Sequence, residues 1–356
     1  MKTNRILSIF MALCLLVTTL AVFTACGGNE TPADTNADTT VDTAAGTVAD
    51  TNADTDEKTK VNVMVLNGTT GFGMAPLMDK NAKGEASLDY TFSVETDASN
   101  ITAALINGSV DMAALPTNAA AALNAKKAGL VQVVAVNTLG VLYLMTSENE
   151  EITSMEDLRG KTVYTPAQNP SFIFTYLCKA NDLEPGTDVI IDTSYAQPAD
   201  LRTALVAGKV DIAVLPEPMV TIAQKANDKL SVDLDLTAVW DDCSEDGSLA
   251  QGCVVVRTAF AQEHPEAVDA FLAEYEASIN YVKENPAEAG QMIAAQGVFA
   301  QAPVATLAIP KCNITFLAGE EMAEKLNAFY TILHGVAPAS VGGSIPDNSL
   351  YYIPTK

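Results

Sequence analysis

The segment ALINGSVDMAALP at residues 104–116 returns 100 positions later as ALVAGKVDIAVLP at residues 204–216. Eight of the thirteen positions are identical, including the glycine, the Val-Asp pair and the final Leu-Pro. Each copy predicts a helix (101–106 and 201–206) that ends at a glycine, because glycine tolerates positive φ, and then a short buried strand that ends at proline. An internal repeat of this length predicts two lobes of related architecture.

The same offset relates the strand and turn that open each half. Residues 61–66 and the turn ending at Phe72 align with residues 161–166 and Phe172. Short apolar strands that alternate with helical segments indicate parallel β-α-β units. We therefore predict an α/β fold with two Rossmann-like lobes, joined by a two-segment hinge near residues 142–147 and 243–256. In open α/β sheets ligands bind outside the carboxyl ends of the strands, so the loops at those ends are the expected site.

These loops supply the candidate ligand-binding residues. The glycines of residues 67–74 permit close backbone approach, and the helix that follows offers amide donors to anionic or carbonyl oxygens, unless the loop is a plain tight turn. Phe72 and Phe172 either face each other across the cleft or pack in the cores. Thr117 and Asn118 either bond a ligand or cap a helix. The candidates are Gly68, Thr69, Thr70, Phe72, Thr117, Asn118, Asn169, Ser171, Phe172 and Glu217, and Asn137 and Thr138 are further ones.

Glu217 is the candidate that says most about the chemistry of the ligand. It stands where the first copy has Thr117, between two prolines that restrict its backbone. A carboxylate at this strand end would recognise an amino group or a protonated nitrogen, and the alternative is that it caps the next helix. The candidate loops contain no Lys or Arg. This favours a neutral or nitrogen-bearing ligand, although backbone amides alone can hold nitrate or a sulfonate.

The first 60 residues differ in composition from the rest of the chain. Two basic residues precede the apolar run 6–23, which is the layout of a secretory signal peptide over residues 1–25. The small residues before Cys26 resemble a bacterial lipobox, with Phe23 in place of the usual Leu, and predict lipidation of Cys26; an uncleaved membrane anchor is the alternative. Residues 26–60 are rich in Ala, Asp and Thr without an aromatic side chain, and predict a disordered tether.

Net charge restricts the partners of the folded part. The chain has 44 acidic and 20 basic residues; eight acidic and four basic residues precede residue 61, which leaves 36 and 16, a net charge of −20. Such a module repels phosphate backbones, so nucleic acid is not an expected partner. About 300 folded residues exceed the size of most single cores, which agrees with two lobes.

Few residues could support catalysis or metal binding. The only histidines, His264 and His334, fall in helical, surface-type contexts, and no CxxC motif occurs. We therefore expect no zinc site, no cofactor and no catalytic site. Cys243 and Cys253 flank a polar stretch and either form a disulfide or stay free.

The order and spacing of these motifs resemble a known family. The pattern ALxxGxVDxAxLP is similar to that of bacterial substrate-binding proteins for nitrate, sulfonates, taurine and thiamine precursors. MEDLRGKTV at residues 155–163 looks like that group's opening of the second lobe. GCVVV at residues 252–256, followed by an acidic helix through His264, looks like its return crossing. Together the similar segments span most of residues 61–356.

The resemblance implies a type II periplasmic-binding-protein-like fold that closes on its ligand. Lobe one would comprise residues 61–145 plus 247–356, and lobe two residues 146–246. The expected protein is a monomeric, lipid-anchored extracytoplasmic component of an ABC importer that delivers a small molecule to a permease and its ATPase. A surface sensor or adhesin, and a biosynthetic enzyme on the same fold, are the alternatives, because a fold does not determine function.

Overall fold

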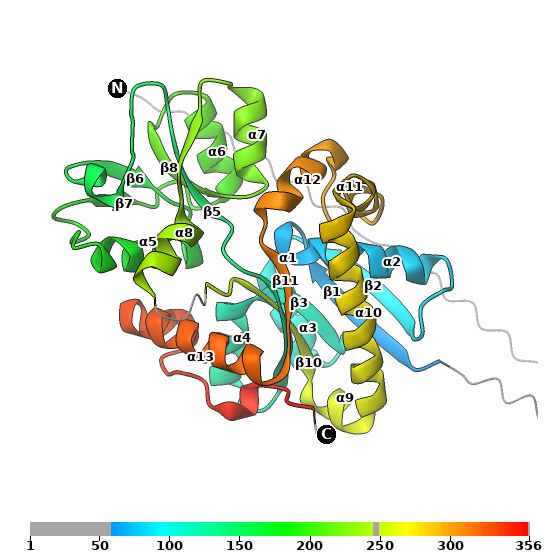
Figure 1. Cartoon of the computed structure of the whole chain (residues 1–356). Coiled ribbons are helices and arrows are strands. Elements are labelled where there is room, and N and C mark those ends of the chain that lie inside the picture. Colours follow the sequence, from blue (N-terminus) through cyan, green and yellow to red (C-terminus); the bar gives the residue numbers. More distant parts are fainter. Residues whose placement is uncertain (1–57, 245–248, 355–356) are drawn as a thin grey trace, which may run out of the picture. The chain divides into compact units, whose positions relative to one another are not determined.

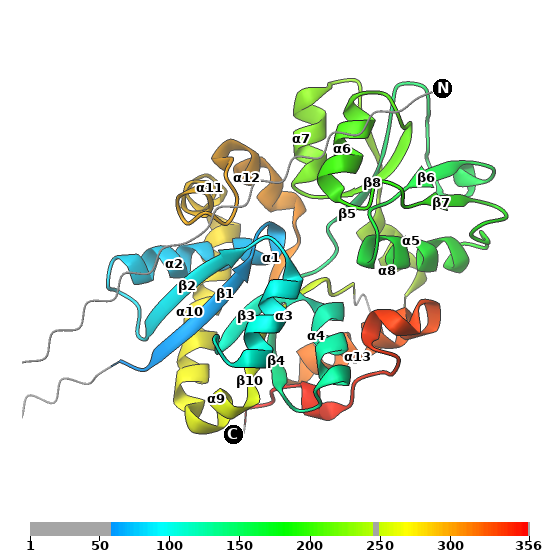
Figure 2. The same ribbon diagram turned by 180° about the vertical axis from the view of Figure 1, so that it is seen from behind.

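The computed structural model describes residues 58–244 and 249–354, and residues Asp56–Lys356 form one compact unit. The predicted signal peptide, Cys26 and nearly all of the predicted tether lie outside the described residues. Within the described part, no helix has the length and apolarity needed to cross a bilayer. Two β-sheets, each covered by helices, organise this unit (Figures 1 and 2).

The first sheet has six strands in the order β11-β4-β10-β3-β1-β2. Three of them, β1, β2 and β3, are parallel, while β10 runs antiparallel between β3 and β4, and β11 pairs antiparallel with β4. We call this sheet and its helices lobe one. The strands are β1 (Lys60–Leu66), β2 (Asp89–Glu95), β3 (Met112–Pro116), β4 (Val131–Thr138), β10 (Gly252–Arg257) and β11 (Ile314–Leu317).

The second sheet has five strands in the order β7-β6-β8-β5-β9 and has the same plan. Strands β6, β7 and β8 are parallel, and β5 runs antiparallel between β8 and β9. We call this sheet and its helices lobe two. The strands are β5 (Leu142–Thr146), β6 (Thr162–Tyr164), β7 (Ile190–Asp192), β8 (Ile212–Pro216) and β9 (Ser231–Asp235).

Helices cover both sheets. Lobe two carries α5 (Asn169–Ala180), α6 (Pro198–Val206), α7 (Met219–Ala226) and α8 (Leu236–Cys243). Lobe one carries α1 (Thr69–Phe72), α2 (Ala75–Ala82), α3 (Ala98–Asn107), α4 (Thr117–Lys126), α9 (Thr258–Glu263), α10 (Pro265–Glu284), α11 (Pro286–Ala295), α12 (Ala302–Ala308) and α13 (Gly319–Val336). Short 3-10 turns occupy Met155–Leu158, Ile309–Lys311, Pro338–Val341 and Asn348–Leu350.

The predicted repeat is present in the structure. Strands β3 and β8 lie 100 positions apart end to end, and α3 and α6 precede them. The predicted glycine stop is seen at Gly108, which caps α3 with φ 78° in the left-handed region, while the Asp97 side chain caps the start of the same helix by accepting from Ser99 N at 2.8 Å. The two-lobed α/β fold is thus confirmed.

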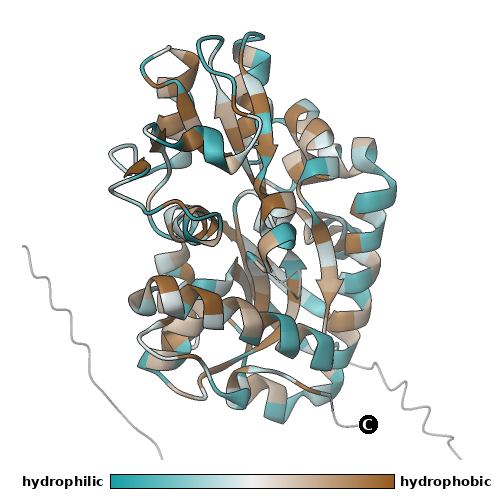
Figure 3. Ribbon diagram, turned by 60° about the vertical axis from the view of Figure 1, so that its left-hand side comes forward, coloured by the Kyte–Doolittle hydropathy of each residue, from teal (hydrophilic) through white to brown (hydrophobic). Residues whose placement is uncertain are grey.

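Apolar residues on the strands form the cores. The strands are mostly hydrophobic, whereas the helices alternate between hydrophobic and hydrophilic residues along their length (Figure 3). One core contains the buried face of β1, formed by Val61, Val63 and Val65, together with buried residues of helices α2 and α10. A second cluster contains buried residues of both sheets and passes from lobe one into lobe two through Trp240, Leu249 and Ala250. The two lobes therefore share part of their hydrophobic core.

The boundary between the lobes differs from the predicted one by a few residues. Residues 142–145 were expected in lobe one, but they form most of β5, which pairs with β8 and β9 of the second sheet. Only residues 139–141 separate β4 of the first sheet from β5 of the second. The crossing is short because β5, the antiparallel strand of the second sheet, begins almost directly after the chain leaves β4.

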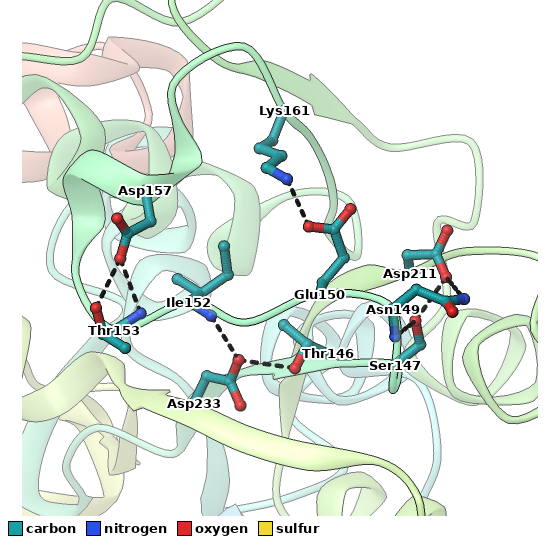
Figure 4. A network of polar contacts seen from close by, with 10 residues as sticks. All are labelled: Thr146, Ser147, Asn149, Glu150, Ile152, Thr153, Asp157, Lys161, Asp211 and Asp233. Atoms are coloured by element: carbon teal, nitrogen blue, oxygen red, sulfur yellow. Dashed lines mark hydrogen bonds and ion pairs between the residues drawn. The ribbon is translucent and has the colours of Figure 1, made fainter.

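Polar contacts fix the chain where it leaves β5 and turns toward β6 (Figure 4). The Asp233 carboxylate accepts from the Thr146 hydroxyl at 2.7 Å and from Ile152 N at 3.0 Å. Asp211 accepts from the Ser147 hydroxyl at 2.6 Å. Ser154 and Asp157 then form a capping box at the turn that follows. These bonds hold the approach to β6 and hence the loop at its carboxyl end.

Candidate functional site

The register of the strands brings the carboxyl ends of the two sheets to the same hinge. Thr138, at the end of β4, pairs with Gly252, and Gly252 also pairs with Pro116 at the end of β3. After the three residues of the first crossing, Leu142 pairs with Pro216 at the end of β8. Because β1 is parallel to β3 and β6 is parallel to β8, the loops after all four strands open toward this crossing. This is the edge at which open α/β sheets bind ligands.

The two crossing segments are hydrogen-bonded to each other. Gln251, in the second crossing, donates its backbone N–H to Thr138 O at 2.9 Å and accepts from Val141 N on its side-chain oxygen at 2.7 Å. Gly140 lies between them, and a Cβ at this position would overlap the Thr237 hydroxyl and the Leu249 side chain. Asn313 adds a bond from its side-chain amide to Gly140 O at 2.6 Å. The hinge is therefore a bonded cluster and not a pair of loose linkers.

Thr117 belongs to this hinge cluster, which corrects its prediction as a ligand donor. Its side chain is completely buried, and its hydroxyl donates to Ala250 O at 2.7 Å. The Tyr330 hydroxyl donates to Thr117 O at 2.9 Å from α13. Thr117 thus anchors the second crossing to the start of α4. Sequence reasoning could not see this role because the partner residue is 133 positions away.

Glu217 is also engaged by the protein. The side chain is buried, and its carboxylate accepts from Thr221 N at 3.1 Å and from the Thr221 hydroxyl at 3.0 Å, so it caps α7 as the alternative interpretation proposed. Lys311 of lobe one places its Nζ 3.7 Å from Glu217 Oε1. Burial raises the pKa of Glu217, and the bonds from Thr221 and the charge of Lys311 oppose that rise. These contacts account for one accepted bond on each oxygen, and Glu217 as a ligand contact stays a prediction.

Phe72 is a core residue of lobe one and does not face Phe172. It is fully buried, and its ring lies 6.1 Å from that of Phe299. Phe172 is partly buried and packs against the cluster shared by both lobes. The alternative of core packing therefore holds for Phe72, because α1 turns inward directly after β1.

Asn137 holds the first turn of α1, directly after the loop that follows β1. Its side-chain amide donates to Thr70 O at 3.0 Å and to the Tyr275 hydroxyl at 2.9 Å, so the buried Asn137 supports this turn. Thr138 donates its hydroxyl to the Asn137 side-chain oxygen at 3.0 Å. Gly68, Thr69 and Thr70 are partly exposed on this support and stay predictions as ligand contacts.

In lobe two, the connection from β6 to α5 has a similar form. The carbonyl of Gln168 accepts from the Ser171 hydroxyl at 2.8 Å and from Phe172 N at 3.0 Å, which starts α5. Asn169, Ser171 and Phe172 lie in the first turn of that helix and stay predictions as ligand contacts.

Unpartnered polar atoms lie on both sides of the hinge. Asn118 Oδ1 at the start of α4 belongs to lobe one, and Thr165 Oγ1 and Asn169 Oδ1 on the β6–α5 connection belong to lobe two. Trp240 Nε1 and Ser244 Oγ flank the second crossing. Each is buried without a hydrogen-bond partner among the described residues, whereas buried polar groups normally have one. Three further such atoms lie elsewhere, on Thr258, Ser340 and Tyr351.

Trp240 joins the lobes at this place. Its ring centroid lies 4.7 Å from that of Tyr176 on α5 and 5.7 Å from that of Phe329 on α13 of lobe one. Together with Gln251 and Lys311, Trp240 is a residue of the interlobe region that the sequence did not assign to the site. The presence of a single tryptophan beside the predicted second crossing was the one available signal.

The residues considered for catalysis lie apart from the hinge. His264 is exposed between α9 and α10, and its ring centroid lies 5.0 Å from that of Phe260 with the planes tilted by 50°; His334 contacts Gly343 O from α13. Cys243 and Cys253 are free thiols, which donate to Trp240 O and Leu115 O respectively, so of the two alternatives the free form is the one observed.

Comparisons with solved structures identify proteins of the same fold. A crystal structure described as an ABC transporter from Parabacteroides distasonis has a TM-score of 0.71 at 24% sequence identity and covers 84% of this chain and 99% of that one. The periplasmic aliphatic sulphonate binding protein SsuA from Escherichia coli has a TM-score of 0.66 at 17% identity, covering 83% and 93%. The periplasmic nitrate-binding protein NrtA from Synechocystis has a TM-score of 0.55 at 15% identity, covering 75% of each chain.

Comparison with curated proteins gives no match. The family model described as NMT1/THI5 like matches residues 84–289, which is more than half of the chain and runs through both lobes and both crossings. This agrees with the family expected from the repeat motif. The chain belongs to the NMT1/THI5-like family.

Proposed function

We propose that the chain is the extracytoplasmic solute-binding component of an ABC importer. In this proposal a small organic or oxyanion solute, such as a sulfonate, nitrate, taurine or a pyrimidine precursor, binds between the lobes. The lobes close on it, and the closed form delivers it to a permease. Two lobes that share short crossings can rotate about them, and the ligand favours closure only through its stronger binding to the closed form.

One observation carries the proposal. Asn118 of lobe one and Asn169 of lobe two both hold a buried side-chain oxygen without a partner, and both stand at the first turn of a helix on the carboxyl edges that open toward the hinge. A polar solute between them would complete both bonds. Family membership and the fold shared with sulfonate- and nitrate-binding proteins support the same function.

The N-terminal motifs support a place at the outer face of the cell membrane. A signal peptide and a lipid on Cys26 would anchor the chain, and a spacer of about 34 residues would reach roughly 30 Å on average. Capture from outside at a micromolar dissociation constant corresponds to about −8 kcal/mol. A monomer suffices for this mode of binding, since both halves of the site come from one chain.

A thermal-shift panel tests the proposal with the full chain in detergent. Nitrate, taurine, alkyl and aryl sulfonates, aminopyrimidine thiamine precursors, riboflavin and amino acids are tested one at a time. A ligand at a hundredfold excess over its dissociation constant stabilises the folded state by about 2.7 kcal/mol. We expect one class to raise the melting temperature, and the rise to shrink in Asn118→Ala and in Asn169→Ala.

Asn107→Ala is the matched control, because Asn107 is exposed at the far end of α3. Its shift with the same compound should equal that of the wild type. If no compound shifts the wild type, a surface sensor or adhesin becomes the better interpretation. If a compound shifts the wild type and both cleft variants equally, the solute binds elsewhere.

A further inference from the structure

Gln168 has a positive φ, and its counterpart in the repeat, which also has a positive φ, is a glycine. It precedes α5 with φ 66° and ψ −128°. The position 100 residues earlier is Gly68, which precedes α1 with φ 98° and ψ −160°. Both connections therefore turn in the same way, but only lobe one uses the residue for which positive φ costs nothing. Lobe two keeps a side chain at a position where a side chain is unfavourable.

No bond of the Gln168 side chain to a described residue compensates this cost. Among the described residues, three other than glycine have positive φ, namely Gln168, Asp182 and Asn313. Asp and Asn tolerate this region because their short side chains bond nearby backbone, whereas Gln lacks that advantage. The Gln168 side chain does not cap α5, is exposed, and makes no hydrogen bond with any described residue. Only the backbone carbonyl of Gln168 accepts hydrogen bonds, from Ser171 and Phe172. Any residue at this position would supply that carbonyl, so these bonds do not explain the glutamine.

The surroundings of Gln168 indicate a ligand. Three residues before it, the Thr165 side chain is fully buried and its hydroxyl has no partner among the described residues. One residue after it, Asn169 Oδ1 is likewise buried and unpartnered. Both flank Gln168 on the same strand-to-helix connection, at the carboxyl end of β6 that opens toward lobe one. Strained residues persist where function requires them.

We infer that Gln168 determines specificity, with its side-chain amide hydrogen-bonding the solute that Thr165 and Asn169 also contact. This rests on the proposed function. A carboxamide offers one acceptor and two donors without charge, so it selects a solute that carries both a donor and an acceptor. The backbone strain at Gln168 is then the cost of holding that amide at the cleft.

Two variants separate the strain from the side chain. Gln168→Gly removes both, and Gln168→Ala removes the amide while it keeps a Cβ at positive φ. We expect Gln168→Gly to melt at a higher temperature than Gln168→Ala, because glycine relieves the strain. Both variants should bind about three- to tenfold more weakly than the wild type, which is the loss expected for one hydrogen bond. Asp182→Gly, just beyond the other end of α5, is the control that replaces another positive-φ residue by glycine away from this loop, and its binding should be unchanged.

Binding is measured by calorimetry with the full chain, using taurine, ethanesulfonate, sodium nitrate and an aminopyrimidine thiamine precursor as separate probes. Weaker binding in both Gln168 variants with wild-type binding in Asp182→Gly supports the inference. Wild-type affinity in both Gln168 variants overturns it while leaving the proposed function intact. If the wild type itself binds none of the four probes, the inference fails together with solute capture of these classes. If Gln168→Gly melts no higher than Gln168→Ala, the strain is absent and the inference is also overturned.

Discussion

Lys311 of lobe one and Glu217 of lobe two form an ion pair across the two sheets, with Nζ and Oε1 3.7 Å apart. The carboxylate side chain is fully buried, whereas the lysine side chain is 44% exposed. The same lysine accepts from the Tyr143 hydroxyl on its backbone oxygen at 2.8 Å, so lobe two contacts both its main chain and its side chain. The pair lies beside the first crossing, because Glu217 N donates to Val141 O at 3.0 Å.

Replacing Lys311 by methionine should destabilise the fold. The buried carboxylate would lose its cationic partner, while the apolar part of the side chain would stay. The pair is longer than a hydrogen bond and half open to solvent, so we expect a loss of about 1 kcal/mol in the free energy of unfolding. Urea denaturation at neutral pH measures this. Lys127→Met, at the exposed end of α4, is the control for loss of a positive charge, and an equal loss in both variants would argue against the pair.

Replacing Glu217 by glutamine should change the dependence of stability on pH. Burial raises the pKa of Glu217 above its ordinary value. The ordinary pKa applies to the unfolded chain and the raised pKa to the folded protein. Between these two values the folded state binds more protons than the unfolded state, so the free energy of unfolding falls as the pH rises. Above the raised pKa the full cost of the buried charge is present. Glu217→Gln lacks this cost and should match the wild type in mild acid and exceed it at neutral pH.

The measurement is the difference in free energy of unfolding between Glu217→Gln and the wild type from mildly acidic to neutral pH. Glu217→Ala is the companion variant, since it removes the cap as well as the charge. It should lose about 1–2 kcal/mol, because Thr221 then lacks its acceptor. A glutamine variant that is as unstable as the alanine variant at neutral pH would show that the carboxylate stabilises the fold on balance.

Removing Phe329 should move the fluorescence of Trp240, the only tryptophan of the chain. The indole is fully buried between Tyr176 and Phe329. Phe329→Ala would open one of its faces, so we expect a red shift of the emission and a loss of about 3–5 kcal/mol. Phe260→Ala is the control, because Phe260 is buried in lobe one beside His264. It should lose stability without any change in emission.

Gly140→Ala should destabilise the hinge. The added Cβ would overlap the Thr237 hydroxyl and the Leu249 side chain, which belong to α8 and to the second crossing. Overpacking of this kind costs about 1–3 kcal/mol. Gly335→Ala is the opposite control, since it lies within α13 with open space around it and should gain about 0.5–1 kcal/mol. Thermal melting of both variants compares them, and a neutral Gly140→Ala would show that the two crossings can move apart freely.

Most of the fold could be predicted from the repeat of residues 104–116. Glycine stops, strand-ending prolines and apolar runs are local features, and two copies at one offset indicate two similar sheets. Capping by Glu217 and core packing of Phe72 were among the alternatives, but the partners of Thr117, Glu217 and Phe72 could not be predicted in this way. Their partners Ala250, Lys311 and Phe299 are far away in the chain, and only the register of β10 and the position of the Ile309–Lys311 turn bring them together.

The position of β10 sets an order for assembly during synthesis. In lobe one β10 lies between β3 and β4, so no strand joins these two until residues 252–257 exist. All five strands of lobe two, by contrast, come from the continuous segment 142–235. Domains generally form as the chain emerges from its N-terminal end. Lobe one, whose first four strands are made before lobe two, therefore stays an incomplete sheet until lobe two has been made, and β10 and then β11 complete it.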